Sequence, residues 1–257
     1  MKEKIITVVI LLALLMISGG ISNAQELTGN DILAKMEELR DITTGKLKLK
    51  MELYNAAGKK RMRKLRSWSM DQGQDKSLIR FLEPADVEGT GFLSLDNKSG
   101  DEDMYLYLPA VNLVRKISGS QKNGSFVGTD FSYNDLAIIG SGNYQDDYQA
   151  IIVEENDKNY VLKIVPTDDD IEYKSGQLVV SKNNWYPQEA KFYDQQGELY
   201  KVLKNSQIEK IDGYWTARKV VMKDVQTGSK TIVHLEEITY DQGVNERIFT
   251  TRYLKRY

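Results

Sequence analysis

The sequence contains no cysteine, a single histidine and only four prolines in 257 residues. The lack of cysteine excludes a disulfide framework, a thiolate metal site and the lipid-modified cysteine of a bacterial lipoprotein. With one histidine as well, the usual Ser-His-Asp, Cys-His and zinc sites are excluded. The one histidine, His234, alternates with Val233 and Leu235 on a predicted strand, where a structural role is expected.

Charge of one sign is also lacking, because 35 basic residues oppose 37 acidic ones and the formal net charge is −2. A balance so close to neutral gives no support for nucleic-acid binding. There is one local basic cluster, which we call the basic hairpin. It indicates either a solvated hairpin tip or a contact with anionic lipid head groups or an acidic partner. Its residues are Lys59, Lys60, Arg61, Arg63, Lys64 and Arg66.

The amino-terminal residues are typical of an export signal. Lys2 and Lys4 precede an apolar run from Ile5 to Ile17, and small residues follow up to Ala24. This run is shorter than the roughly 20 residues that a membrane-spanning helix needs, although an uncleaved anchor remains the alternative. We therefore expect residues 1–24 to be a cleaved signal peptide and residues 25–257 to form a single exported domain, because no Pro/Gly/Ser-rich linker divides them.

After the predicted signal peptide, the apolar residues repeat first with a helical period and then with a period of two. Ile32, Leu33, Met36 and Leu39 share one face of a helix that Thr28 or Asn30 caps. From Lys46 onward the period is two, so Leu47, Leu49, Met51 and Leu53 share one face of a strand. The returning segment 61–71 carries Trp68 and Met70, which we place on the same inner face through a bulge near Leu65.

The second half of the sequence predicts strand after strand, separated by turn residues. These strands include 148–154, 160–165, 171–181, 187–193, 199–208, 215–223, 229–240 and 247–253. Between the halves, Ser132 and Asp135 match a capping box, which predicts a short helix over 130–138. The pattern favours a mainly β (α+β) fold, in which an antiparallel sheet of about eleven strands curls into a barrel or partial barrel.

Three acidic runs are the remaining candidates for chemistry, namely residues 101–103, 146–147 and 168–170. They could supply a glycosidase pair or a calcium site. However, each lies in turn-like sequence and none fits the twelve-residue calcium loop, so a solvent-facing role is expected. No metal site, cofactor site or phosphate-binding loop is predicted.

The block from Arg80 to Leu136 carries a resemblance to a known family. Its matching motifs are RFLEPADVEGTGFL (80–93), YLPA (107–110) and SFVGTDFSYNDL (125–136). Through these motifs the chain resembles the outer-membrane lipoprotein-sorting, LolA-like family of Gram-negative bacteria. The resemblance implies a half-open antiparallel β-barrel wrapped over helices, here the N-terminal helix and the short helix, on or in its concave face. It also implies an apolar cavity that carries acyl chains of lipoproteins or lipids through the periplasm.

The resemblance and the strand pattern together predict an apolar, non-enzymatic binding site with lipid or lipoprotein acyl chains as its ligands. An inner-membrane transporter or an outer-membrane acceptor would be the further partners. The predicted cavity residues are Leu47, Leu49, Met51, Leu53, Trp68, Met70, Phe92, Tyr107, Phe126 and Phe131.

Two other hypotheses stay open at this point. One is a non-enzymatic envelope interaction module with a filled core, which docks to a membrane or transporter partner through the basic hairpin or the aromatic edge 105–108. The other is an envelope hydrolase that uses carboxylates, which predicts a polar cleft lined by two acidic groups with perturbed pKa values.

Overall fold

Thirteen strands form one antiparallel sheet in the computed structural model, which describes residues 26–97, 100–142 and 144–256. The predicted signal peptide, residues 1–24, lies outside the described residues. The strands, in chain order, are β1 (Thr44–Tyr54), β2 (Lys60–Asp71), β3 (Asp75–Glu83), β4 (Gly91–Asn97), β5 (Gly100–Leu108), β6 (Leu113–Ile117), β7 (Tyr148–Glu155), β8 (Asn159–Pro166), β9 (Ser175–Ser181), β10 (Pro187–Tyr193), β11 (Leu199–Ile211), β12 (Tyr214–Asp224) and β13 (Lys230–Tyr240).

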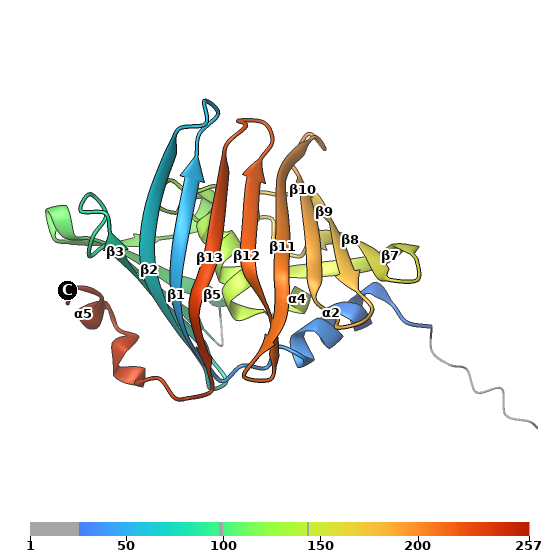
Figure 1. The fold of residues 1–257 in the computed structure, drawn as a ribbon, viewed down its shortest axis with the longest axis horizontal. Helices are drawn as coiled ribbons and strands as arrows, with labels where there is room; N and C mark the ends of the chain where they lie inside the picture. The colour runs from blue at the N-terminus through green and yellow to red at the C-terminus, as the bar shows by residue number, and fades with distance from the viewer. Residues whose placement is uncertain (1–25, 98–99, 143, 257) are drawn as a thin grey trace, which may run out of the picture.

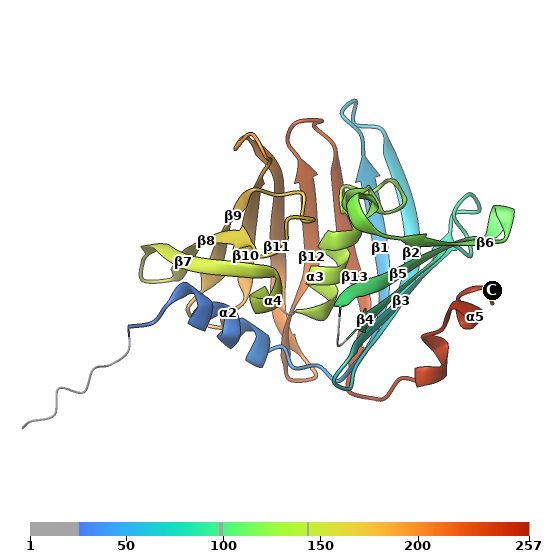
Figure 2. The ribbon, with the colours of Figure 1, turned by 180° about the vertical axis from the view of Figure 1, so that it is seen from behind.

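The sheet consists of two meanders, β1–β6 and β7–β13, which meet where β1 pairs with β13. Strands β6 and β7 are the two ends of the sheet, and no ladder joins them among the described residues, so the barrel is open. A mainly β, half-open curled sheet is thereby confirmed, with thirteen strands instead of about eleven. The curvature produces a concave side, which is seen from the front in Figure 2.

The helices occupy both sides of the sheet. Helices α2 (Gly29–Glu38), α3 (Tyr133–Ser141) and α4 (Tyr144–Asp147) lie on the concave side, whereas α5 (Thr251–Leu254) lies on the outside, beside β3 and β4 (Figures 1 and 2). Single 3₁₀ turns are η2 (Pro109–Val111), η3 (Gly119–Asn123), η4 (Phe126–Gly128) and η5 (Glu246–Ile248). In the described part of the chain, none of the helices has the length and apolar character that crossing a bilayer requires.

Helix α2 covers the free edge of β7. Thr28 and Asp31 form a capping box, and Ile32, Leu33 and Met36 of the predicted apolar stripe are buried, whereas its fourth member, Leu39, is 40% exposed. The backbone N–H of Ala150 on β7 donates to the Asn30 side chain over 2.7 Å. A Cβ at Gly29 would come within 2.4 Å of the Ala150 carbonyl, so only glycine allows this close approach. The helix thereby occupies an edge that would otherwise be open to strand pairing.

Helix α3 begins as the sequence predicts. The Ser132 side chain accepts the Asp135 backbone N–H, and the Asp135 side chain accepts the Ser132 backbone N–H, which is a complete capping box. The helix ends at Gly142, whose φ of 75° is the left-handed conformation that glycine adopts without strain. The helix lies against the concave face of the sheet, so its apolar residues pack on the concave-side core.

The buried apolar residues form two clusters. The larger one fills the concave side between the sheet and helices α2 and α3. The smaller one lies on the outer face of β2–β5, where the carboxy-terminal segment contributes Phe249 and Leu254. The predicted strand over 247–253 is therefore wrong. Thr250 caps the short helix α5, and Phe249 and Leu254 are five residues apart, which suits a turn and a helix rather than an alternating strand.

The second cluster also corrects the predicted face of β2. Strand β2 pairs with β1 without a bulge, so Leu65, opposite Leu49, faces inward, while Trp68 and Met70, opposite Lys46 and Thr44, face outward. Met70 is a buried member of the outer cluster and Trp68 packs against it. The bulge near Leu65 exists, but it lies in the pairing of β2 with β3.

Candidate functional site

An apolar cavity of about 330 Å³ lies between the concave face of the sheet and helices α2 and α3. This volume falls in the range of small-molecule binding sites, roughly 300–1,000 Å³. Most of the side chains around it are aliphatic or aromatic. Among them are Leu33, Met36, Leu47, Leu49, Met51, Leu65, Ile79, Phe131, Leu136, Ile138, Ile139, Ile164, Leu178, Phe192, Leu203, Trp215, Val220, Met222, Val233 and Leu235.

Strand β1 places three of the predicted residues at this cavity. Leu47, Leu49 and Met51 alternate with lysines along the strand, so the three apolar side chains share the concave face. The pairing of β1 with β13 shifts by one residue at Lys48–Leu49, and Val233 lies opposite Met51. Because β1 and β13 are the central pair of the sheet, these residues form the floor of the cavity.

The segment from η4 to α3 forms the opposite wall. Phe131, Leu136 and Ile139 line the cavity from this side. Polar contacts hold the segment to the strands at its amino-terminal end. Arg63 of β2 donates to the Val127 carbonyl, and Thr231 of β13 donates to the Asp130 carboxylate over 2.5 Å.

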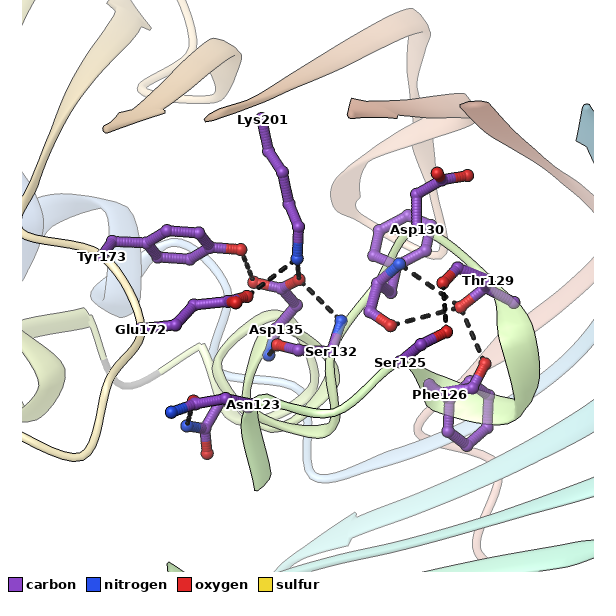
Figure 3. Close-up of polar contacts among 12 residues, drawn as sticks. Asn123, Ser125, Phe126, Thr129, Asp130, Ser132, Asp135, Glu172, Tyr173 and Lys201 are labelled. Atoms are coloured by element: carbon purple, nitrogen blue, oxygen red, sulfur yellow. Dashed lines mark hydrogen bonds and ion pairs between the residues drawn. The ribbon is translucent and has the colours of Figure 1, made fainter. Parts of the chain in front are cut away.

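The strongest of these polar contacts surround Asp135, at the start of α3 (Figure 3). Its carboxylate accepts the Ser132 backbone N–H at 2.8 Å and the Tyr173 hydroxyl at 2.7 Å. The Lys201 ammonium of β11 lies 3.5 Å from Asp135 and 2.8 Å from Glu172. The side chains of Asp135 and Lys201 are only 4% and 5% exposed, so this is a buried ion-pair network.

Burial and the charge of the ion-pair partner act in opposite directions on the pKa values of Lys201 and Glu172. Burial lowers the pKa of Lys201, but Asp135 and Glu172 outweigh it, so the pKa lies above its ordinary value. Burial raises the pKa of Glu172 in spite of Lys201. Burial, followed by the charge of Asp135, also raises the pKa of Tyr173 well above its ordinary value, so its hydroxyl stays a donor. The network therefore fixes α3 against β11 through a compensated charge.

A second anchor lies at the other end of α3. Arg40, just after α2, donates to the Ile139 carbonyl over 2.5 Å and to the Tyr144 hydroxyl over 2.6 Å. The side chain also borders the apolar cavity. One guanidinium thereby connects α2, α3 and α4 at the edge of the cavity. The sequence pattern places Arg40 only on the polar face of its helix and gives no indication of this contact.

The remaining predicted cavity residues have different positions. Leu53 and Phe131 line a second, polar cavity, and Phe131 borders both cavities. Phe92 and Phe126 pack edge to face at 5.4 Å within the concave core. Met70 borders the apolar cavity and belongs to the outer cluster, where Trp68 and Tyr107 also lie. Contact of these ten residues with a ligand stays a prediction.

The acidic run 168–170 is exposed, as its turn-like sequence indicates, whereas Glu102 and Asp147 of the other two runs are partly buried. Burial, and then the charges of Asp146 and Glu102, raise the pKa of Asp147 to about 7. Burial also raises the pKa of Glu102, which borders the apolar cavity. Within the described ranges, no group of three or more acidic or histidine side chains is arranged to hold a metal ion. His234 lies on the outer face opposite Lys50 and Lys219.

The fold and the motifs have relatives among known proteins. A family model with the description "uncharacterized protein" matches residues 73–256. No curated protein matches the chain. A structure from Vibrio parahaemolyticus, described provisionally as an outer membrane lipoprotein-sorting protein domain, is 31% identical with a TM-score of 0.80. The alignment covers 89% of this chain and 98% of that one.

Two further solved structures are similar. A DUF1329 family protein from Desulfovibrio piger is 30% identical with a TM-score of 0.82, over 88% of this chain and 97% of that one. A LolA superfamily protein from Nitrosomonas europaea is 21% identical with a TM-score of 0.71, over 88% and 99%. At this lower identity, the third structure shows a shared fold.

Proposed function

Since the chain belongs to the outer-membrane lipoprotein-sorting, LolA-like family, we propose that it is a periplasmic carrier that binds acyl chains of lipoproteins or lipids in its apolar cavity. The role requires export, for which the predicted signal peptide 1–24 is the support. The acyl chains would move towards the outer membrane, with an inner-membrane transporter as donor or an outer-membrane protein as acceptor.

The apolar cavity is the observation that carries this proposal. Most of its side chains from β1, β11–β13, α2 and α3 are aliphatic or aromatic, and the transfer of a hydrocarbon chain into such a site gains about 0.8 kcal/mol per CH₂. Four methionines, Met36, Met51, Met70 and Met222, lie around it. Methionine side chains adapt to ligands of variable shape, which suits a carrier of acyl chains that differ in length.

A carrier must also release its ligand, and the anchors of α3 supply a route. The amino-terminal end of α3 is held by a buried ion-pair network, whereas the carboxy-terminal end is held by hydrogen bonds of Arg40. Loss of the Arg40 contacts would let the end of α3 move away from α2. No chemical reaction is needed for either binding or release.

The test is uptake of a fluorescent fatty-acid probe by the purified protein. Met51→Glu places a charge in the cavity and is expected to abolish uptake, as is Leu49→Arg. The matched control is Lys46→Glu, which introduces a carboxylate on the exposed face of the same strand and is expected to bind normally. Val220→Trp fills the cavity without adding a charge and is also expected to reduce uptake. A folded Val220→Trp variant therefore tests the cavity even if the charged variants unfold.

Uptake no better than that of an unrelated β-protein would overturn the carrier proposal and favour the interaction module with a filled core. Normal uptake by a folded Met51→Glu variant would exclude this cavity as the binding site. If uptake is observed and Met51→Glu abolishes it, mass spectrometry of organic extracts from the natively purified protein identifies the acyl ligand.

A further inference from the structure

A second cavity, of about 410 Å³, is lined in part by residues of the β1–β2 and β12–β13 hairpins. These two hairpins lie at the same end of the sheet (Figure 1). In contrast to the first cavity, polar and charged groups make up most of the lining of the second cavity. These residues are Tyr54, Asn55, Lys59, Arg61, Asn123, Ser125, Thr129, Asp130, Tyr200, Lys201, Asp224, Thr227 and Ser229, with Leu53 and Phe131 as its large apolar members.

The two cavities are successive layers of one inner surface. Along β1, Met51 lines the apolar cavity and Leu53 lines the polar one. The same step of two residues separates Leu203 from Lys201 on β11, and also Met222 from Asp224 on β12. Residues two apart in a strand share a face and are separated by about 7 Å. The lining of the concave face thus changes from apolar to polar over about 7 Å along each of these strands.

Phe131 lies at this boundary. Its side chain is 3% exposed and lines both cavities. An aromatic ring at this position separates the two spaces without a polar contact of its own. The two cavities therefore adjoin at this side chain.

The lining of the polar cavity carries three cations, Lys59, Arg61 and Lys201, against two carboxylates, Asp130 and Asp224. Both carboxylates keep their charge but are held by neutral donors, because Asp130 accepts the Thr231 hydroxyl at 2.5 Å and Asp224 accepts the backbone N–H groups of Gln226 and Thr227. Lys201 is compensated by Asp135 and Glu172.

The two remaining cations, Lys59 and Arg61, lie exposed at the cavity and form no ion pair with any residue that the structure describes. Arg61 is opposite Leu53, on the inner face of β2. By contrast, Lys60 of the same hairpin is directed to the outer face, where it pairs with Glu52 at 2.9 Å. The basic hairpin thus presents two of its charges to the polar cavity.

We propose that the polar cavity binds the anionic head group of an amphiphile whose hydrocarbon chain lies in the apolar cavity. Lys59 and Arg61 pair with the oxygen atoms of the head group, which is a phosphate or a carboxylate. This inference rests on the proposed function, since it assumes that the apolar cavity holds an acyl chain. It adds the ligand class: a single-chain, negatively charged amphiphile is preferred over a neutral one.

The test compares three probes with the same palmitoyl chain, namely palmitate, lysophosphatidate and neutral monopalmitoylglycerol. The variant is Lys59→Gln with Arg61→Gln. Because charge-assisted hydrogen bonds are among the stronger ones, we expect the two anionic probes to bind about tenfold more weakly. Monopalmitoylglycerol is expected to bind as it does to the unaltered protein. The matched control is Lys60→Gln with Arg66→Gln, which removes the same charge from the outer face of β2.

Equal weakening of the neutral probe, or equal weakening by the control variant, would overturn the head-group site. Inorganic phosphate that binds as tightly as lysophosphatidate would overturn it too, because the site would then take a free anion rather than an amphiphile. If the unaltered protein bound all three probes equally and Leu49→Arg abolished them all, the carrier would stand and the head-group site would fall. Absence of binding by every probe would remove the proposed function itself, and the head-group site with it.

Discussion

Asp135 is the residue on which the polar contacts of the concave side converge. It completes the capping box of α3, accepts the Tyr173 hydroxyl and pairs with Lys201, all in an environment from which water is excluded. Each of its two carboxylate oxygens is thereby occupied. A buried charge with several partners fixes geometry more strongly than a solvent-exposed pair does.

Replacement of Asp135 by Asn is expected to destabilise the protein by roughly 2–4 kcal/mol, because it leaves the buried Lys201 with less compensation. Urea unfolding measures the change. Asp31→Asn is the matched control, since Asp31 has the same capping-box position in α2 but is exposed. Its expected cost is below about 1 kcal/mol. Equal costs at the two positions would show that Asp135 acts only as a cap.

The sequence predicted part of this residue network. The spacing of Ser132 and Asp135 predicts the cap, because both partners are local. It cannot indicate Lys201, which lies 66 positions away and meets Asp135 only through the fold. Lys201 occupies a strand position whose neighbours of the same face, such as Leu203, are apolar. Sequence patterns treat such a lysine as an exposed residue.

At the scale of the elements, the two ends of helix α3 are anchored differently, and the end next to Arg40 has fewer polar contacts to other elements among the described residues. Helix α3 ends at Gly142 and the short helix α4 follows. The polar contact that holds this end of α3 to another element is the hydrogen bond from the Arg40 guanidinium to the Ile139 carbonyl, and the same guanidinium donates to Tyr144. The amino-terminal end, in contrast, carries the capping box and the ion-pair network. Opening of the helix is therefore expected to begin at its carboxy-terminal end.

We expect Arg40→Met to increase amide hydrogen exchange of α3 by about tenfold, equivalent to the loss of roughly 1.4 kcal/mol of local stability. The substituted side chain keeps apolar contacts but leaves the Ile139 carbonyl without this donor. Exchange in β1 should stay unchanged. Hydrogen exchange detected by mass spectrometry resolves the two regions, and Lys35→Met on the exposed face of α2 is the control. Uniform acceleration throughout the chain would indicate general destabilisation instead.

At the same scale, strand β1 and the short helix α3 follow from the sequence, but the faces of β2 do not. Alternation identifies an inner face only when the opposite face is exposed to solvent. On β2 the outer face is covered by the carboxy-terminal segment, so Trp68 and Met70 are apolar for a different reason than Leu65. The covering residues Phe249 and Leu254 are 179 and 184 positions away from Met70 in the sequence, and no local pattern indicates that they meet.

For the molecule as a whole, the buried carboxyl groups predict how stability depends on pH. The pKa of Asp147 is raised from 3.8 to about 7, and burial raises the pKa values of Glu102 and Glu172 as well. A group whose pKa is higher in the folded state binds more protons there than in the unfolded state. Its stabilising contribution is complete below the ordinary pKa and is lost as the pH rises to about 7.

We therefore expect the melting temperature to fall as the pH rises from about 5 to about 7. Asp147→Asn should reduce this slope and stabilise the protein above pH 7 by about 1–2 kcal/mol, a value discounted because the side chain is partly exposed. Calorimetry over this pH range measures both effects. The exposed Glu198→Gln variant serves as the control. An unchanged slope in Asp147→Asn would contradict the assignment to this carboxyl group.

The strand order has a further consequence, for the biosynthesis of the protein. Every neighbouring pair in the sheet is a sequential hairpin or meander step except β1 with β13, which joins the first strand of the chain to the last. Until residues 230–240 have left the ribosome, the two half-sheets have no common strand pairing and β1 exposes an unpaired, partly apolar edge. An emerging chain of this kind exposes unpaired strand edges and needs chaperone protection until its synthesis is nearly complete.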